Sequence, residues 1–200
     1  MVTVNSPAEI LSAPVNLKRW TVEEYHQLSE LGLLTPEERT ELIAGQIIIM
    51  ASKGIPHVSA LRIIALRFDE FLRDKPFFVS AQDPIRLDDL SEPEPDLAIV
   101  RGSLFTYTDR HPQPKDVSLI VEVADSTLRN DCEVKAETYA QANITEYWVL
   151  DLPYQRLHVF QKPTATGYGS HLILMQDNQV SPLAFPELVL DISSLFPPTH

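Results

Sequence analysis

Two acidic residues of this chain lie in stretches that are otherwise typical of buried β-strands, and a lysine follows them on a predicted helix. Asp96 begins the apolar run 97–100, Glu122 lies inside the apolar run 118–123, and Lys135 comes next. A charged group is costly to bury unless it is paired or binds a metal ion. The pattern therefore indicates a site that performs chemistry.

These residue types are suited to metal-assisted hydrolysis of a phosphodiester. Carboxylate oxygens bind hard cations such as Mg²⁺ or Mn²⁺, and Mg²⁺ usually takes only one or two carboxylates because it keeps several waters. A bound cation makes a water nucleophilic and stabilises developing negative charge. Asp96 and Glu122 would hold the ion, and Lys135 would orient the water or stabilise the charge.

Each of these residues also has a purely structural interpretation. Asp96 can cap the start of its strand, and Lys135 can pair in solvent with Asp131, which would stabilise the helix by only about 0.3 kcal/mol. Asp131 fits the N-cap of that helix better than a ligand position. His57 fits either a helix start or a ligand. Glu122 has the weakest structural interpretation, since an unpaired glutamate in mid-strand is expensive.

Alternating helix and strand signals predict a central β-sheet flanked by helices, an α/β (α+β) fold. Thr21 and Glu24 form a capping box for a helix that ends near Gly32. Thr35–Glu38 repeats this signal, which predicts a second, short helix that carries Glu41. The other predicted elements are a strand at 46–50, a helix over 58–73, strands at 77–80, 84–87, 97–100 and 118–123, a helix over 131–142, a strand at 146–151, and a C-terminal hairpin extension of strands 156–161 and 170–175.

The composition is that of a globular protein. The chain has 200 residues, of which 44% are hydrophobic and 22% charged, enough for one core. We expect a flexible arm at 1–16 and a single domain at 17–200. No apolar run reaches the ~18–20 residues that span a bilayer, and the start lacks a signal-peptide pattern. We therefore expect a cytoplasmic protein with no membrane partner. Cys132 is the single cysteine, which excludes an intrachain disulfide and a cysteine zinc site.

The charge balance argues against a simple nucleic-acid-binding protein. Lys and Arg total 16 against 28 Asp and Glu, for a net charge of -12. Nucleic-acid binding depends on cations that neutralise phosphates, so the overall field of this chain opposes it. Local basic residues, a second subunit or metal ions would have to supply positive charge.

Several motifs together give the chain a specific resemblance. Over roughly residues 18–195, the chain resembles the Uma2 family of bacterial proteins in the order and spacing of these motifs. That family belongs to the PD-(D/E)XK nuclease superfamily with the restriction-endonuclease-like fold. The matching stretches are 39–45 (RTELIAG), His57 before the long helix, 94–97 (EPDL), 120–123 (IVEV) with Ser126-Thr127, and Asp131, Lys135 and Tyr139 leading into 146–151 (EYWVLD).

The resemblance implies a catalytic set of Glu41, Asp96, Glu122 and Lys135. It implies that Asp96, Glu122, the backbone carbonyl of Val123 and Glu41 bind Mg²⁺ or Mn²⁺. The usual superfamily motif places its lysine two residues after the second acid, where this chain has an alanine. In the Uma2 family that lysine is displaced to the next helix, and Lys135 matches it. Glu41 has structural alternatives, since it can also pair with Arg39 or Lys135 or face water.

The expected function is a metal-dependent endonuclease that hydrolyses phosphodiester bonds of DNA. The alternative is a catalytically inactive member of the fold that acts as a binding or assembly module, which the acidic charge keeps open. A metal-dependent hydrolase of a small substrate is a further option. We also expect a homodimer, because nucleases of this superfamily often cut both strands as dimers and two-fold dimers are the commonest assembly.

Overall fold

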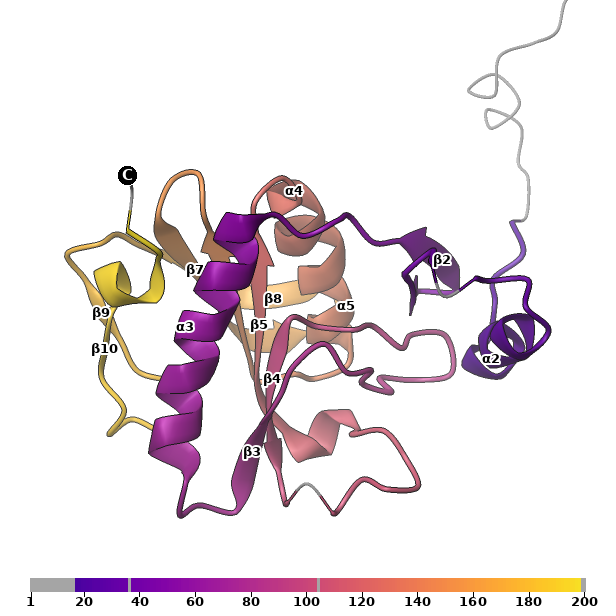
Figure 1. The fold of residues 1–200 in the computed structure, drawn as a ribbon, viewed down its shortest axis with the longest axis horizontal. Helices are drawn as coiled ribbons and strands as arrows, with labels where there is room; N and C mark the ends of the chain where they lie inside the picture. Colours follow the sequence, from indigo (N-terminus) through magenta and orange to yellow (C-terminus); the bar gives the residue numbers. More distant parts are fainter. Residues whose placement is uncertain (1–16, 36, 104, 199–200) are drawn as a thin grey trace, which may run out of the picture.

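A six-stranded mixed β-sheet forms the centre of the molecule (Figure 1). The structure is a computed structural model that describes residues 17–35, 37–103 and 105–198. The predicted arm at 1–16 lies outside the described residues. In spatial order, the strands of the sheet are β3 (Phe77–Ser80), β4 (Leu97–Arg101), β5 (Val117–Ala124), β6 (Glu146–Asp151), β7 (Arg156–Thr164) and β8 (Gly167–Leu174).

Within this sheet β5 and β6 run parallel, while the other neighbouring strands pair antiparallel. Two parallel strands cannot be joined by a tight turn, so a helical crossover has to connect β5 to β6. That crossover carries Lys135 and leaves from the strand that carries Glu122. Its consecutive parts are α4 (Leu128–Asn130), the π-helical stretch η2 (Asp131–Lys135) and α5 (Ala136–Gln141).

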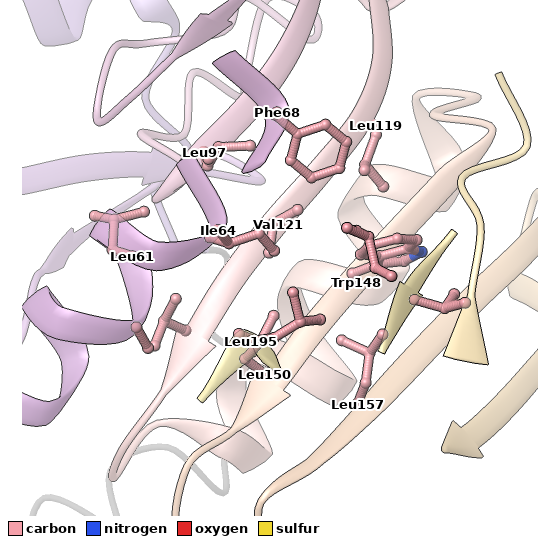
Figure 2. Packing of buried hydrophobic residues seen from close by; sticks show 14 of the residues in the cluster. Leu61, Ile64, Phe68, Leu97, Leu119, Val121, Trp148, Leu150, Leu157 and Leu195 are labelled. Carbon is pink, nitrogen blue, oxygen red and sulfur yellow. The ribbon is translucent and has the colours of Figure 1, made fainter. Parts of the chain in front are cut away.

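One face of the sheet is covered by the long helix α3 (Ile55–Leu72), which lies across it in Figure 1. Ile64 and Phe68 recur at helical spacing on the buried side of α3 and belong to the same core cluster as Leu119 and Trp148 (Figure 2). The Phe68 and Trp148 rings lie 6.2 Å apart. Burying side chains of this size stabilises the fold by about 1.5–3 kcal/mol each. The helix is therefore fixed on the sheet, and so is its N-terminal end.

The crossover helices cover the opposite face. Ala136 and Tyr139 of this segment pack into a second core cluster with Tyr147 and Phe160 of the sheet. The Tyr139 and Tyr147 rings lie 4.9 Å apart. Helices thus flank both faces of a mixed sheet, which confirms the predicted α/β (α+β) class.

The predicted second helix near Glu41 is wrong. The chain instead forms a hairpin of β1 (Thr40–Ile43) and β2 (Gln46–Ile49), which follows the capped helix α2 (Val22–Glu30). Ala44 and Gly45 both have positive φ, 51° and 77°, as a two-residue hairpin turn requires. The isoleucine-rich sequence after the turn favours strand pairing, and this outweighs the helix-start signal of 35–38. Glu41 therefore lies on a strand.

Other predicted elements change as well: α3 begins three residues earlier than predicted, and β7 and β8 are longer than the predicted strands. Residues 84–87 form no strand; Ile85 is buried, but its N–H donates to the carbonyl of Pro93 in a loop. The crossover helix begins three residues earlier than predicted, at Leu128, with Thr127 at the N-cap. Asp131 is thus inside the helix and does not cap it.

The C-terminal hairpin extends the central sheet, since β7 pairs with β6 and β8 pairs with β7. A short ladder of β9 (Gln179–Val180) and β10 (Leu190–Asp191), followed by the 3₁₀ turn η3 (Ile192–Leu195), completes the core over the α3 face. Within the described residues, none of the helices combines the length and apolar character needed to cross a bilayer.

Candidate active site

A pocket of about 210 Å³ opens where the β1–β2 hairpin, the start of α3, the strands β4 and β5 and the crossover helix meet. We call it the carboxylate pocket. Four buried carboxylate side chains line it, each at most 5% exposed, and one lysine side chain is buried with them. These residues are Glu41, Asp96, Glu122, Asp131 and Lys135.

Asp96 stands directly before β4. Its Oδ2 accepts the backbone N–H of Val123 at 2.9 Å. Its Oδ1 lies 3.1 Å from His57 Nε2 and 3.1 Å from Lys53 Nζ. Burial raises the pKa of this carboxyl, but the hydrogen bond and charge of His57 and the charge of Lys53 outweigh burial and lower the pKa to about 2. Asp96 is therefore ionised at neutral pH.

Glu122 lies on the neighbouring strand β5 and is tied to Asp96 through the backbone. Its Oε2 accepts the N–H of Asp96 at 3.2 Å. Its Oε1 accepts from Lys135 Nζ at 2.9 Å and from the Tyr139 hydroxyl at 3.0 Å. Burial is the main cause that raises the pKa of Glu122, to about 8, and the other carboxylates of the pocket add to it against the opposing charge of Lys135. The pocket thus holds more negative charge than its own cations neutralise.

Lys135 joins two elements that are far apart in the sequence. Its ammonium lies 2.9 Å from Glu122 Oε1 and 3.2 Å from Glu41 Oε2. Burial lowers the pKa of Lys135, yet the charges of Glu122, Glu41 and Asp131 outweigh burial and raise it above its usual range. Lys135 is therefore a permanently charged group, fixed between the sheet and the hairpin.

Glu41 enters the pocket from β1. Besides Lys135, it accepts the backbone N–H of Glu94 at 3.3 Å. Of the alternatives open for Glu41, the structure shows the ion pair with Lys135. The β1–β2 hairpin is thereby attached to the loop before Asp96 and to the crossover helix.

Asp131 was expected to be an N-cap, and this is wrong. Its side chain is 4% exposed and accepts the Thr127 hydroxyl at 2.6 Å. Burial is the main cause that raises its pKa. Because a helix can begin before an N-cap-type residue, the sequence pattern alone could not place Asp131 inside the helix.

The structure thus brings the predicted Glu41, Asp96, Glu122 and Lys135 into one pocket. Val123 also lines the pocket, and its N–H donates to Asp96 Oδ2. Metal binding by the Val123 carbonyl stays a prediction. His57, which the sequence left open between helix start and ligand, contacts Asp96. Sequence reasoning missed Lys53. The only signal was its position four residues before His57, just ahead of the predicted long helix.

The donor chemistry of the pocket fits a hard divalent cation. No group of three or more His, Cys, Asp and Glu side chains in the described part of the chain is assembled as a ready metal site. Mg²⁺, however, needs only one or two carboxylates together with water. Asp96, directly before β4, and Glu122, on β5, are oxygen donors. Burial is the main cause that raises the pKa of Glu122 and the neighbouring carboxylates add to it, so a cation bound here would favour the ionised form.

The fold of this chain is shared with a solved structure. A solved structure from Anabaena variabilis ATCC 29413, described as "a putative nuclease belonging to DUF820", has the same fold with a TM-score of 0.64. It is 16% identical, and the match covers 88% of this chain and 97% of that one.

The family of the chain is shown by sequence. The Uma2 family, described as "Putative restriction endonuclease", matches residues 22–193, so the chain belongs to the Uma2 family. No curated protein matches the chain.

Proposed function

We propose that this chain is a metal-dependent endonuclease that hydrolyses phosphodiester bonds of DNA. The observation that supports it best is the placement of Asp96, Glu122 and Lys135 in one pocket open to solvent, with Lys135 ion-paired to Glu122. The chain also belongs to a family described as "Putative restriction endonuclease". In the reaction, a water oxygen would bond to phosphorus while one P–O ester bond breaks. The water would lose a proton and the leaving oxygen would gain one.

Asp96 and Glu122 would hold Mg²⁺ or Mn²⁺, with Glu41 and the Val123 carbonyl as further oxygen donors. The ion would supply Lewis-acid activation of water and neutralisation of charge. The reciprocal hydrogen bonds between the two acids and the two strand backbones fix the separation of the carboxylates before any ligand arrives. Such preorganisation is what a charge-stabilising site requires.

Lys135 would act on the substrate side of the same site. Its ammonium is anchored by two carboxylates, so its position does not depend on the substrate. A fixed cation stabilises the negative charge that develops on the phosphoryl oxygens, and it can also orient the attacking water. Tyr139, which donates to Glu122, holds the carboxylate in the orientation that faces Lys135.

The net charge of -12 demands extra cations for DNA binding. Divalent ions would supply part of this positive charge. We also propose a homodimer, because it would place two pockets on one duplex. β8 offers an open edge for such pairing: its outer neighbour is absent among the described residues, and Leu172 and Ile173 are exposed. A monomeric mass in solution scattering would contradict the dimer.

One observation favours a second function. The carboxylates of the pocket are already paired with protein cations, Asp96 with Lys53 and His57, and Glu122 with Lys135. Such internal ion pairs are also what an inactive binding or assembly module would retain. This alternative predicts neither metal affinity nor cleavage.

A plasmid-nicking assay decides between the two. Supercoiled DNA is incubated with the full chain in Mg²⁺, in Mn²⁺ and in EDTA. We expect nicking with either metal, none in EDTA, and none for Asp96→Asn or Glu122→Gln. Asp69→Asn and Glu70→Gln are the matched controls, because both residues are exposed on α3, remote from the pocket lining. Cleavage that persists in the two pocket variants would exclude this site, and no cleavage by the parent chain would favour the binding module.

A further inference from the structure

Among the residues that the structure describes, the ammonium group of Lys53 has no hydrogen-bond partner. The residue lies in the connection between β2 and α3, and its side chain is 15% exposed. Its Nζ lies 3.1 Å from Asp96 Oδ1, close enough for an ion pair. Across the described residues, however, no acceptor meets hydrogen-bond geometry at this buried atom. Lysine carries three donors and no acceptor, so the missing partner has to be an acceptor.

Asp96 does not need Lys53 to be satisfied. Its Oδ2 already accepts from the Val123 N–H, and its Oδ1 faces His57 Nε2 at 3.1 Å. Leaving a buried donor without a partner costs about 1–3 kcal/mol. A group that only stabilised the fold would be expected to complete its hydrogen bonds, and unsatisfied buried groups call for another explanation.

The position of Lys53 favours an anionic partner that enters from solvent. Its backbone neighbours Ser52 and Gly54 are exposed, so the side chain reaches into the pocket from the rim. Gly54 is the N-cap of the 18-residue helix α3 and makes no side-chain cap. The N-terminal end of a helix carries partial positive charge and uncapped N–H groups, which add to the field of the ammonium.

We propose that Lys53 is a second lysine of the active site with two successive partners. In the metal-free protein it neutralises Asp96. With Asp96 bound to a divalent ion, the Lys53 ammonium would turn on its flexible side chain to a phosphate oxygen of the bound nucleic acid. This inference rests on the proposed nuclease function, and it assigns Lys53 a contact with the substrate. No bond is made or broken by Lys53.

Two measurements on Lys53→Met test the two proposed partners of Lys53, which are Asp96 in the metal-free protein and a phosphate oxygen in the complex. The first is Mn²⁺ binding by calorimetry without DNA. Removing a positive charge beside Asp96 should tighten Mn²⁺ binding on the order of tenfold, since one unit charge a few ångströms away repels a divalent ion appreciably even at high dielectric. The second is binding of a DNA duplex in Ca²⁺, followed by fluorescence anisotropy across a range of salt concentrations. Loss of one phosphate contact should weaken binding and reduce the salt slope by about 0.9.

Two further variants complete the design. Lys115→Met removes the same charge from an exposed position remote from the pocket, and it should leave Mn²⁺ affinity unchanged. Lys53→Arg keeps the charge and should restore the salt slope. Far-UV circular dichroism checks that each variant is folded.

The results separate this inference from the function on which it rests. A parent chain that binds no Mn²⁺ and leaves plasmid DNA intact overturns both. A parent chain that binds Mn²⁺ and nicks DNA, with Lys53→Met equal to Lys115→Met in either measurement, overturns the role of Lys53 alone. Both the tighter metal binding and the lower salt slope are required to support it.

Discussion

Replacing Glu122 by glutamine should stabilise the metal-free protein while it abolishes cleavage. Burial raises the pKa of this carboxyl from 4.5 to about 8. Between these two values the folded state binds a proton that the unfolded state has lost, so stability decreases as pH rises from 4.5 to about 8. At pH 7 this linkage costs the folded protein about 3 kcal/mol.

The structure also shows what glutamine would lose. One amide oxygen can still accept from Lys135 and Tyr139, as Glu122 Oε1 does now. The amide nitrogen then faces the N–H of Asp96 in place of Oε2, and the lost hydrogen bond costs about 1 kcal/mol. Lys135 keeps its contact with Glu41. The expected net gain is therefore about 2 kcal/mol at pH 7. It is about zero at pH 5, where the unfolded carboxyl is also partly protonated and the linkage falls to about 1 kcal/mol.

Urea denaturation in EDTA measures this gain at both pH values. Glu70→Gln, on the exposed side of α3, is the control and should change the free energy of unfolding by no more than about 0.5 kcal/mol. A loss of stability in Glu122→Gln at pH 7, or a difference from the parent chain that is the same at both pH values, would refute the reasoning that this carboxyl is strained by burial.

Three other perturbations test neighbouring parts of the structure. Lys135→Met removes the buried cation that Glu41 and Glu122 share, so the metal-free protein should lose about 3–5 kcal/mol through the broken buried pair with Glu41, and Mn²⁺ should restore part of it; unchanged urea stability would contradict the ion pairs. Phe68→Ala should lower the free energy of unfolding by about 3–5 kcal/mol, because the ring is fully buried under α3; a smaller loss in thermal or urea unfolding would mean that the helix can collapse onto the sheet. Burial is the main cause that lowers the pKa of His158 and of His171 below 6.5. The unfolded state therefore binds protons first, and the free energy of unfolding should fall as pH drops below about 6.5. In His158→Gln the free energy of unfolding should depend less steeply on pH, and an unchanged pH dependence would exclude these two histidines as its source.

The central sheet could be predicted because its strands carry their own signal. The runs 97–100 and 118–123 are apolar on both faces, which a strand covered by helices on both sides requires. Glu122 interrupts one of these runs, and a single charged residue in such a run cannot be explained by burial alone. Asp96 and Glu122 were therefore identified from their positions beside and within apolar runs, together with the free-energy cost of burying a charge. The structure places both acids in the carboxylate pocket.

The hairpin that carries Glu41 could not be predicted in the same way. Residues 35–38 have the composition of a helix start, and four-residue strands are too short for a periodic signal. What decides the outcome is the pairing of β1 with β2 and the attachment of Gly45 to the rest of the fold, where its N–H donates to the carbonyl of Leu90. These are tertiary interactions, which override local propensity.

The cations of the site were the least predictable part. Lys135 was found through its family motif, while Lys53 has no pattern at all, because a lysine in a polar connection is indistinguishable from a solvated one. Both lysines lie in the pocket, where Lys135 contacts Glu122 and Lys53 contacts Asp96. With four buried carboxylates against these two cations, the metal-free pocket is under electrostatic strain. A divalent ion would relieve that strain and, by binding only the folded state, would raise stability by mass action. The same imbalance that lowers the stability of this fold therefore supplies the driving force for metal binding, so affinity and strain should change together when Glu122 or Asp131, the carboxyls whose pKa is raised, is neutralised.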